Sequence, residues 1–472
     1  MGRARDRRGN VDVVERQGTA PVGRLLLQYS LPAVAGFLVN ALYQFVDRIL
    51  VGRGVGTEAM AAVTCAYPLT ILSMGIGLLL GTGTGNQVST FLGQGRRDEA
   101  ERVLGQAVRL SVLLGGGIAI AYLLLAHPIL RLCGAEGAVL DMAVPFLRIT
   151  ALGQACLIAI ISMGNILRVQ GRPGLGLAFM SGGTVLNAVL ATWAIFGLHL
   201  GVVGAALATT IATAANLAAI LVFVQGPRSL LRIRRVHLRA NAALARSIVE
   251  LGAPVFLMQV LGTLVFLSAN HGALALDGAR GVAAVGVFNT VNILLIYPPL
   301  GVAQAMQPLV AFNRGAGRPD RVRALVGRVL ASTTAMGSLS ALAVSLFPWA
   351  VAGLFTRSDA RLVELVGAGL PWFMVSVAVF GLQGTASHYF LAMQRPRPAA
   401  VLLLGRQLLA IPLFLALPRL LGFRGLYMVT LLSDVPFAVL AAFLLRSEWK
   451  QLRAPAVPEE SAEGGRGVAV EA

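Results

Sequence analysis

Long apolar runs, separated by short polar or glycine-rich links, make up most of the chain between residues 25 and 445. An α-helix needs about 20 apolar residues to cross a hydrocarbon core about 30 Å thick, and each run is long enough. The pattern therefore predicts an all-α integral membrane protein with twelve transmembrane helices. They are expected at residues 25–51, 59–82, 103–126, 138–165, 174–197, 201–225, 249–275, 282–311, 324–350, 361–392, 398–418 and 424–445.

The second half of the chain repeats the first. A shift of 222 residues aligns Gly93, Gly95, Arg96 and Asp98 with Gly315, Gly317, Arg318 and Asp320. The same shift aligns GTEAMAAV (56–63) with GARGVAAV (278–285). Because each half has six spans, the repeats are parallel, and two homologous six-helix bundles of this kind suit alternating access. The expected division is a tail at 1–22, a lobe at 23–225, a basic linker at 226–247, a lobe at 248–446 and a tail at 447–472.

Composition supports a membrane protein. Hydrophobic residues make up 56% of the chain and charged residues 13%, with a mean hydropathy of +0.76, whereas soluble domains are about a quarter charged. The net charge of +18 does not indicate nucleic acid, because the arginines lie between spans. They are concentrated in alternate links and in the tails, so the positive-inside rule predicts that both termini are cytoplasmic. The basic residues are nearly all arginine, and with the abundant alanine and glycine this indicates a bacterial source, hence an inner-membrane protein.

Motifs for cofactors or catalysis are missing from the sequence. The three cysteines are scattered, which predicts neither a disulfide framework nor a metal site. The glycine-rich segments near residues 93 and 315 lack the GK[ST] ending of a phosphate loop. A membrane-embedded transferase, which would be an enzyme, should carry DxD-type carboxylates, and none is present. The expectation is a protein without cofactor that is not an enzyme and draws on an ion gradient.

Asp47 is the leading functional candidate. The first span carries no charge over its first 22 residues before this aspartate, and an ionisable group inside a membrane helix is costly. Two interpretations remain open: a functional carboxylate in a cavity, or an interfacial one paired with Arg48 or Arg53. Pro32, 15 residues earlier, can kink the same helix.

Other polar residues at membrane depth are weaker candidates. Most such groups make interhelical hydrogen bonds. Asp434, in the last span, could line a cavity or cap a broken helix. The candidates for lining a cavity are Tyr43, Gln44, Gln259, Asn289 and Asp434.

Between residues 20 and 450 the chain resembles the multidrug and toxic compound extrusion (MATE) family. The resemblance rests on the order and spacing of several motifs. They are NALYQFVDRILVG (40–52), LGQG (92–95), QGRP (170–173), IYPPLGVAQAMQP (296–308) and FNRGAGRPDRV (312–322).

The resemblance implies a secondary transporter that expels organic, often cationic, drugs in exchange for protons or sodium ions. It matches Asp47 to an ion-coupling aspartate and Pro32 to a hinge proline, with Asn187 and Thr209 as supporting residues. The second acidic position of the family is Ala191 here. Because one carboxylate suits sodium less well than two, proton coupling is favoured and sodium stays possible. Small organic cations or drugs and membrane lipid are the expected partners, and the protein is expected to act as a monomer.

A rival interpretation within the same superfamily is a flippase for lipid-linked oligosaccharide or polysaccharide. Such a protein should carry more cations in its cavity. In the sequence, only Arg148 and the region of Arg48 are candidates for that role.

Overall fold

The structure is a computed structural model that describes residues 15–54, 57–355 and 359–451, without the side chains of residues 41, 43–54, 57 and 451. A helical turn at residues 15–19 precedes the first long helix. The first half of the chain then forms α2 (Val22–Gly54), α3 (Thr57–Gly93), α4 (Arg97–Leu132), α5 (Gly137–Val169), α6 (Pro173–Thr192), the π-helical turn η1 (Trp193–Gly197) and α7 (Gly201–Gln225).

The second half begins inside the predicted linker. A short 3₁₀ turn, η2 (Arg235–Leu238), is followed by a helix that starts at Ala242. The remaining elements are α8 (Ala242–Gly315), α9 (Pro319–Leu346), α10 (Pro348–Phe355), α11 (Ala360–Ala392) and α12 (Pro396–Gln451).

Two of these helices each contain two membrane crossings. The described chain has ten helices that are long and apolar enough to span. The longest, α8, has 74 residues and would measure about 110 Å if it were continuous. It breaks at Asp277 and Gly278, where φ is 53°, and α12 breaks at Gly422, where φ is 59°. Counting both breaks gives twelve spans, which confirms the predicted fold class.

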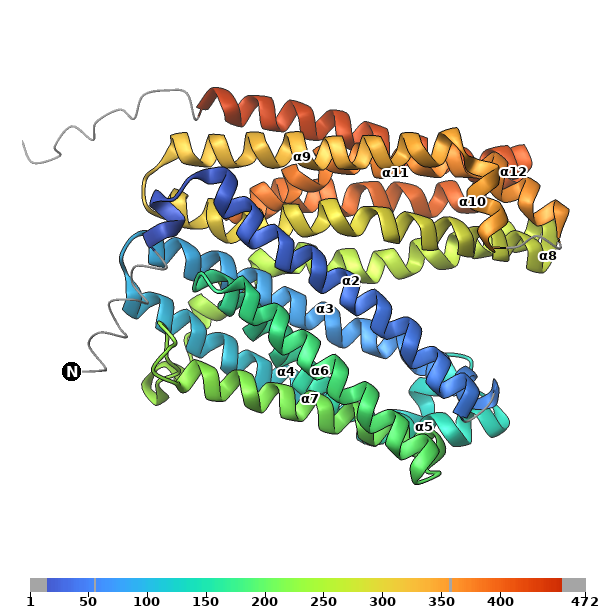
Figure 1. Ribbon diagram of the computed structural model, residues 1–472, viewed down its shortest axis with the longest axis horizontal. Coiled ribbons are helices and arrows are strands. Elements are labelled where there is room, and N and C mark those ends of the chain that lie inside the picture. Colours follow the sequence, from blue (N-terminus) through green and yellow to red (C-terminus); the bar gives the residue numbers. More distant parts are fainter. Residues whose placement is uncertain (1–14, 55–56, 356–358, 452–472) are drawn as a thin grey trace, which may run out of the picture.

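The spans form two lobes that meet at one end. In Figure 1, α2–α7 (blue to green) and α8–α12 (yellow to red) lie close together on the left and diverge to the right. The start of α2 and the end of α12 both lie at the closed end. This arrangement follows from an even number of crossings.

Four tight corners at the closed end show the repeat in the backbone. At Gly95, Gly171 and Gly317 φ is 74°, 79° and 65°, and at Gln394 it is 53°. Each corner carries the two backbone bonds of a Schellman motif; at the first, Arg96 N–H donates to the Phe91 carbonyl and Gly95 N–H to the Leu92 carbonyl. Gly95 and Gly317 are separated by the repeat offset, so the two halves turn at equivalent residues.

The lobes touch through a pair of equivalent glycines on α3 and α8. A Cβ added at Gly93 would lie 2.1 Å from the Phe312 carbonyl oxygen, and one at Gly315 would lie 2.1 Å from the Thr90 carbonyl oxygen. Both pairs are related by the 222-residue offset. The backbones therefore approach too closely for any side chain at these glycines, which closes this end of the molecule.

The segment before α2 joins the two lobes. The buried Gln17 side chain donates to the Val169 carbonyl in the N-terminal lobe at 2.8 Å. Its backbone carbonyl accepts from the Asn313 amide in the C-terminal lobe at 3.0 Å. Arg318 and Arg321 donate to the Gly18 and Ala20 carbonyls. We call residues 15–21 the strap, because these bonds connect the lobes at the closed end.

Candidate ion-coupling site

Asn187 and Thr209 meet inside the N-terminal lobe. The Asn187 amide nitrogen, on α6, donates to the Thr209 hydroxyl, on α7, at 3.1 Å. That hydroxyl donates to the Ala205 carbonyl at 3.0 Å. Asn187 is only 4% exposed, and its carbonyl oxygen has no hydrogen-bond partner among the described residues. A buried acceptor without a partner costs about 1–3 kcal/mol, so this oxygen is a ready position for a proton donor or a cation.

Ala191 lies one helical turn beyond Asn187, and its neighbours are apolar too. It is 1% exposed and belongs to a cluster with Ile195 and Val202. The position of the family's second acid is therefore a dry packing contact in this chain. This position therefore supplies no carboxylate beside Asn187 in this chain.

Three predicted site residues of α2 have side chains outside the described residues: Asp47, Tyr43 and Gln44. The backbone register of α2 is nevertheless set by a close contact with α6, because a Cβ at Gly36 would lie 2.8 Å from Met180 Cε. The two helices run in the same direction (Figure 1). Residue 47 lies as far along α2 from Gly36 as Ala191 lies along α6 from Met180. The α2 backbone at residue 47 is therefore level with Ala191 in the Asn187 site.

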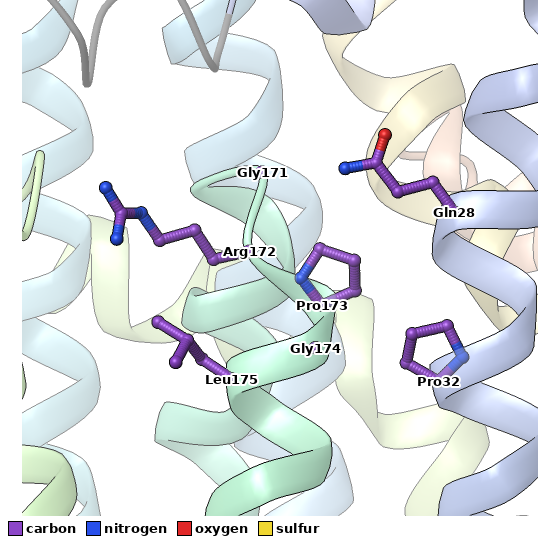
Figure 2. Close-up of a pocket in the computed structure, with 7 residues that line it drawn as sticks. All are labelled: Gln28, Pro32, Gly171, Arg172, Pro173, Gly174 and Leu175. Atoms are coloured by element: carbon purple, nitrogen blue, oxygen red, sulfur yellow. The ribbon is translucent and has the colours of Figure 1, made fainter.

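Pro32 lies in the first half of α2 beside an open pocket. A proline has no N–H, so the Gln28 carbonyl one turn earlier lacks its helical hydrogen bond. Both residues line a pocket of about 480 Å³ whose other wall is the corner between α5 and α6. Figure 2 shows Gln28 and Pro32 across the space from Pro173. This pocket is separate from the Asn187 site, and it leaves room for α2 to bend at its weakest turn.

The C-terminal lobe candidates differ in their surroundings. Gln259, on α8, is half-buried and faces the other lobe, since a Cβ at Gly75 of α3 would lie 3.6 Å from Gln259 Cβ. Asn289, in the second part of α8, is exposed.

Asp434 forms an ion pair that the sequence analysis missed. Its carboxylate lies 3.0 Å from the Arg406 guanidinium, with side-chain exposures of 5% and 33%. The two residues stand on opposite sides of the Gly422 break in α12, each well inside its span. The two roles predicted for Asp434, a free carboxylate that lines a cavity and a cap of a broken helix, are therefore both wrong. The sequence signal for this pair was the arginine within the apolar run 398–418. Arg406 is thus a third cation at membrane depth, besides Arg148 and the region of Arg48.

Comparisons with known proteins agree with this architecture. The family model described as MatE matches the chain twice, at residues 32–193 and 254–415. The two matches begin 222 residues apart, which is the offset of the internal repeat.

Relatives and solved structures extend the similarity over nearly the whole chain. The chain is 26% identical over 427 residues to the multidrug export protein MepA of Staphylococcus haemolyticus (strain JCSC1435), covering 90% of this chain and 93% of that protein. It is similar in fold to a MOP superfamily transporter from Pyrococcus furiosus, with a TM-score of 0.86, 22% identity and coverage of 94% and 99%. An outward-facing multidrug resistance MATE family transporter gives a TM-score of 0.85, 23% identity and coverage of 94% and 98%.

Proposed function

The chain belongs to the MatE family, the multidrug and toxic compound extrusion transporters, and on that premise we propose that it is a multidrug efflux transporter. It exports organic, often cationic, compounds in exchange for protons by alternating access. The relative from Staphylococcus haemolyticus is a multidrug export protein, which supports the same substrate class. The chemistry is transport and not catalysis.

The buried Asn187 carbonyl oxygen is the observation that carries the coupling proposal. It lacks a partner among the described residues, and the α2 backbone at residue 47 lies at the level of Ala191, one helical turn beyond Asn187. Protonated Asp47 would donate to this oxygen, whereas the ionised form would leave the oxygen free and attract an organic cation. The same carboxylate thus binds either a proton or a cationic substrate, as an exchanger requires.

The single carboxylate favours protons over sodium. A sodium ion without its water needs several oxygen ligands with negative charge among them. Ala191 supplies neither, because it is packed in an apolar cluster. A proton needs only one carboxylate and an acceptor beside it.

The direction of opening follows from the charge distribution. The closed end carries the corner arginines Arg96, Arg172, Arg318 and Arg395 and the arginine-rich segment at residues 226–241. By the positive-inside rule this end faces the cytoplasm. We therefore assign both termini to the cytoplasm of the inner membrane and an outward-facing state to this conformation. Protonation from outside would then bend α2 at Pro32 and release the drug.

The test is drug accumulation in an efflux-deficient bacterium. Wild type, Asp47→Asn and a matched control, Asp141→Asn, are expressed at equal membrane levels with ethidium or norfloxacin. Asp141 is an exposed carboxylate near the start of α5, so its loss should not matter. Wild type and Asp141→Asn should lower accumulation, a protonophore should abolish the effect, and Asp47→Asn should fail.

Accumulation lowered equally by Asp47→Asn would sink the coupling role of this residue. If neither wild type nor the variants change drug accumulation, the flippase function becomes the preferred alternative. Arg406 adds a membrane-depth cation that such a site would use, but its pairing with Asp434 leaves little free positive charge. Binding of a lipid pyrophosphate, measured against an organic cation, would then separate the two functions.

A further inference from the structure

A groove in the C-terminal lobe lies between α9 and the last turns of α12. Its volume is about 510 Å³, and Leu330 of α9 and Leu382 of α11 form one side. The other side is a single face of α12, because its members are three, four, seven and eight residues apart. They are Ala442, Leu445, Arg446, Trp449 and Lys450.

The groove is amphiphilic along its length. Its inner part is apolar, and its outer part, at the end of α12, carries Arg446 and Lys450. Both cations are exposed, and neither has a hydrogen bond or an ion pair within the described part of the chain. The acid nearest to them in sequence, Glu448, is buried and pairs with Arg395 and Tyr389 instead. No acid in the described part of the chain therefore compensates the positive charge of the groove.

The equivalent groove in the N-terminal lobe is filled by the chain itself. Gly201 and Gly422 both have a positive φ, of 55° and 59°, so the repeat offset here is 221 and relates Leu445 to Val224 and Arg446 to Gln225. Val224 is buried in a cluster with Leu231 from the segment that follows α7, and Gln225 donates to a carbonyl of that segment. Leu445 and Arg446 line the groove instead. Among the described residues, the repeat thus has a cover in one lobe and an open surface in the other.

Specific hydrogen bonds hold that cover in place. Gln106 of α4 donates to the His237 carbonyl at 3.0 Å, and the Gln170 side chain accepts from Leu230 N–H at 2.8 Å. Gln225 donates to the Ile233 carbonyl at 3.1 Å. A segment placed by three glutamines indicates that this groove has to be filled. The open counterpart therefore calls for a separate occupant.

We propose that an anionic phospholipid binds in the open groove. Its phosphate lies between Arg446 and Lys450, and an acyl chain lies along Leu445, Leu330 and Leu382. Basic pockets between transmembrane helices bind anionic headgroups, and tryptophan favours the headgroup level, where Trp449 lies. The proposal depends on membrane embedding and is independent of the transported substrate. Figure 1 shows this part of α12 and α9 on the outer side of the C-terminal lobe.

Quenching of Trp449 fluorescence tests the site in the full-length purified protein. Trp193, Trp349 and Trp372 are first replaced by Phe, so that Trp449 is the single tryptophan. Brominated phosphatidylglycerol, which is anionic, should quench Trp449 at lower concentration than brominated phosphatidylcholine, which has no net charge. Equal quenching by both lipids would overturn the proposal.

Charge variants decide whether the two cations select the lipid. Each cation near an anionic lipid contributes about fivefold to affinity, so Arg446→Gln with Lys450→Gln should weaken phosphatidylglycerol quenching by up to about 30-fold. Arg419→Gln with Arg424→Gln is the matched control, because both arginines are exposed on α12 away from the groove. The control should behave as the parent; equal loss in both double variants would contradict a specific site.

A truncation separates the lipid from the remaining chain as occupant. Residues after Arg453 include Glu459, Glu460 and Glu463, which could also pair with the cations. If lipid occupies the groove, a chain ending at Arg453 quenches as the full chain does. Quenching seen only after truncation would assign the groove to the tail instead. Native mass spectrometry of otherwise wild-type protein supplies an independent readout, because phosphatidylglycerol should be retained in preference to phosphatidylcholine and lost in the double variant.

Discussion

Asn187 and Arg406 show how differently the two lobes treat polar side chains at membrane depth. Asn187 is buried, and its carbonyl oxygen has no partner among the side chains that the structure describes, whereas Arg406 is neutralised by Asp434 at 3.0 Å. A free acceptor can exchange partners during transport. A closed ion pair must first be broken, so the N-terminal lobe is the better candidate for ion coupling and the C-terminal pair is better suited to holding α12 together across its break.

The Arg406–Asp434 pair gives a prediction about stability. Arg406→Leu and Asp434→Leu alone should each destabilise the protein by about 3 kcal/mol, because each leaves an unpaired charge at low dielectric. The double variant should be more stable than either single variant. Melting temperatures of the purified protein in detergent measure the four members of this cycle. Additive losses in the double variant would mean that the two residues act independently.

At the scale of single elements, α2 combines a rigid contact with a weak turn. Gly36 fixes it against Met180 of α6, and the turn at Pro32 lacks one hydrogen bond and borders a pocket of about 480 Å³. Motion of the residue-47 end of α2 relative to its start therefore has a defined pivot.

Replacing the pivot should impair transport while keeping the fold. Pro32→Ala restores the missing hydrogen bond, and because a proline inside a helix costs about 3 kcal/mol, a bent α2 should become roughly 100-fold less populated. Drug efflux should fall strongly while the melting temperature stays or rises. Pro68→Ala, at an exposed proline inside α3, is the control and should keep efflux. Full efflux by Pro32→Ala would show that bending at this residue is not required.

At the scale of the whole molecule, the closed end depends on contacts between lobes that only the folded chain brings together. The glycines Gly93 and Gly315 allow backbone contact between α3 and α8. The strap adds hydrogen bonds to both lobes through Gln17. In alternating access all of these contacts must separate. Their strength therefore sets the population of the conformation in which this end is closed.

Weakening the strap should shift that population. Asn313 is fully buried and bonds the Gln17 carbonyl at 3.0 Å. Since a buried hydrogen bond contributes about 1 kcal/mol, Asn313→Ala should raise the fraction opened at this end about fivefold. Asn241→Ala removes an exposed helix cap outside the lobe contact and should leave the fraction unchanged.

The distance between the lobes reports the outcome. Spin labels at Asp98→Cys and Asp320→Cys, both exposed and related by the repeat, lie on the first turns of α4 and α9. Cys65, Cys133 and Cys156 are replaced beforehand. The fraction of molecules with a longer distance between the two labels should increase in Asn313→Ala and stay unchanged in Asn241→Ala. An identical distance distribution in both variants would rule out the strap as a lock.

Much of the fold was predictable because lipid imposes simple rules. The twelve spans followed from run length alone, and the repeat followed from glycines such as Gly95 and Gly317, which the corners need for their positive φ. Gln394 shows the limit of that signal: its φ is 53° without a glycine, so glycine positions do not reveal the fourth corner.

The candidate site was predictable in part. Asn187 and Thr209 were selected by resemblance, and the structure brings them to 3.1 Å. The side chain of Asp47 lies outside the described residues, so its place in the site stays a prediction. Asp434 was selected as a lone carboxylate, and its partner was not recognised. The spans at 398–418 and 424–445 were predicted separately, but apolar helices do not reveal from sequence which of their residues face each other.

The sequence by itself determined the number of crossings, the twofold repeat and the excess of positive charge at one end, because these depend on length, composition and glycine positions along the chain. Only the tertiary structure decided which polar groups meet, which groove the segment after α7 covers and where the lobes touch. Helices in lipid are apolar on nearly every side, so hydrophobic periodicity does not reveal which face turns inward. Packing between helices fixes that rotation, and with it the partners of each buried polar side chain.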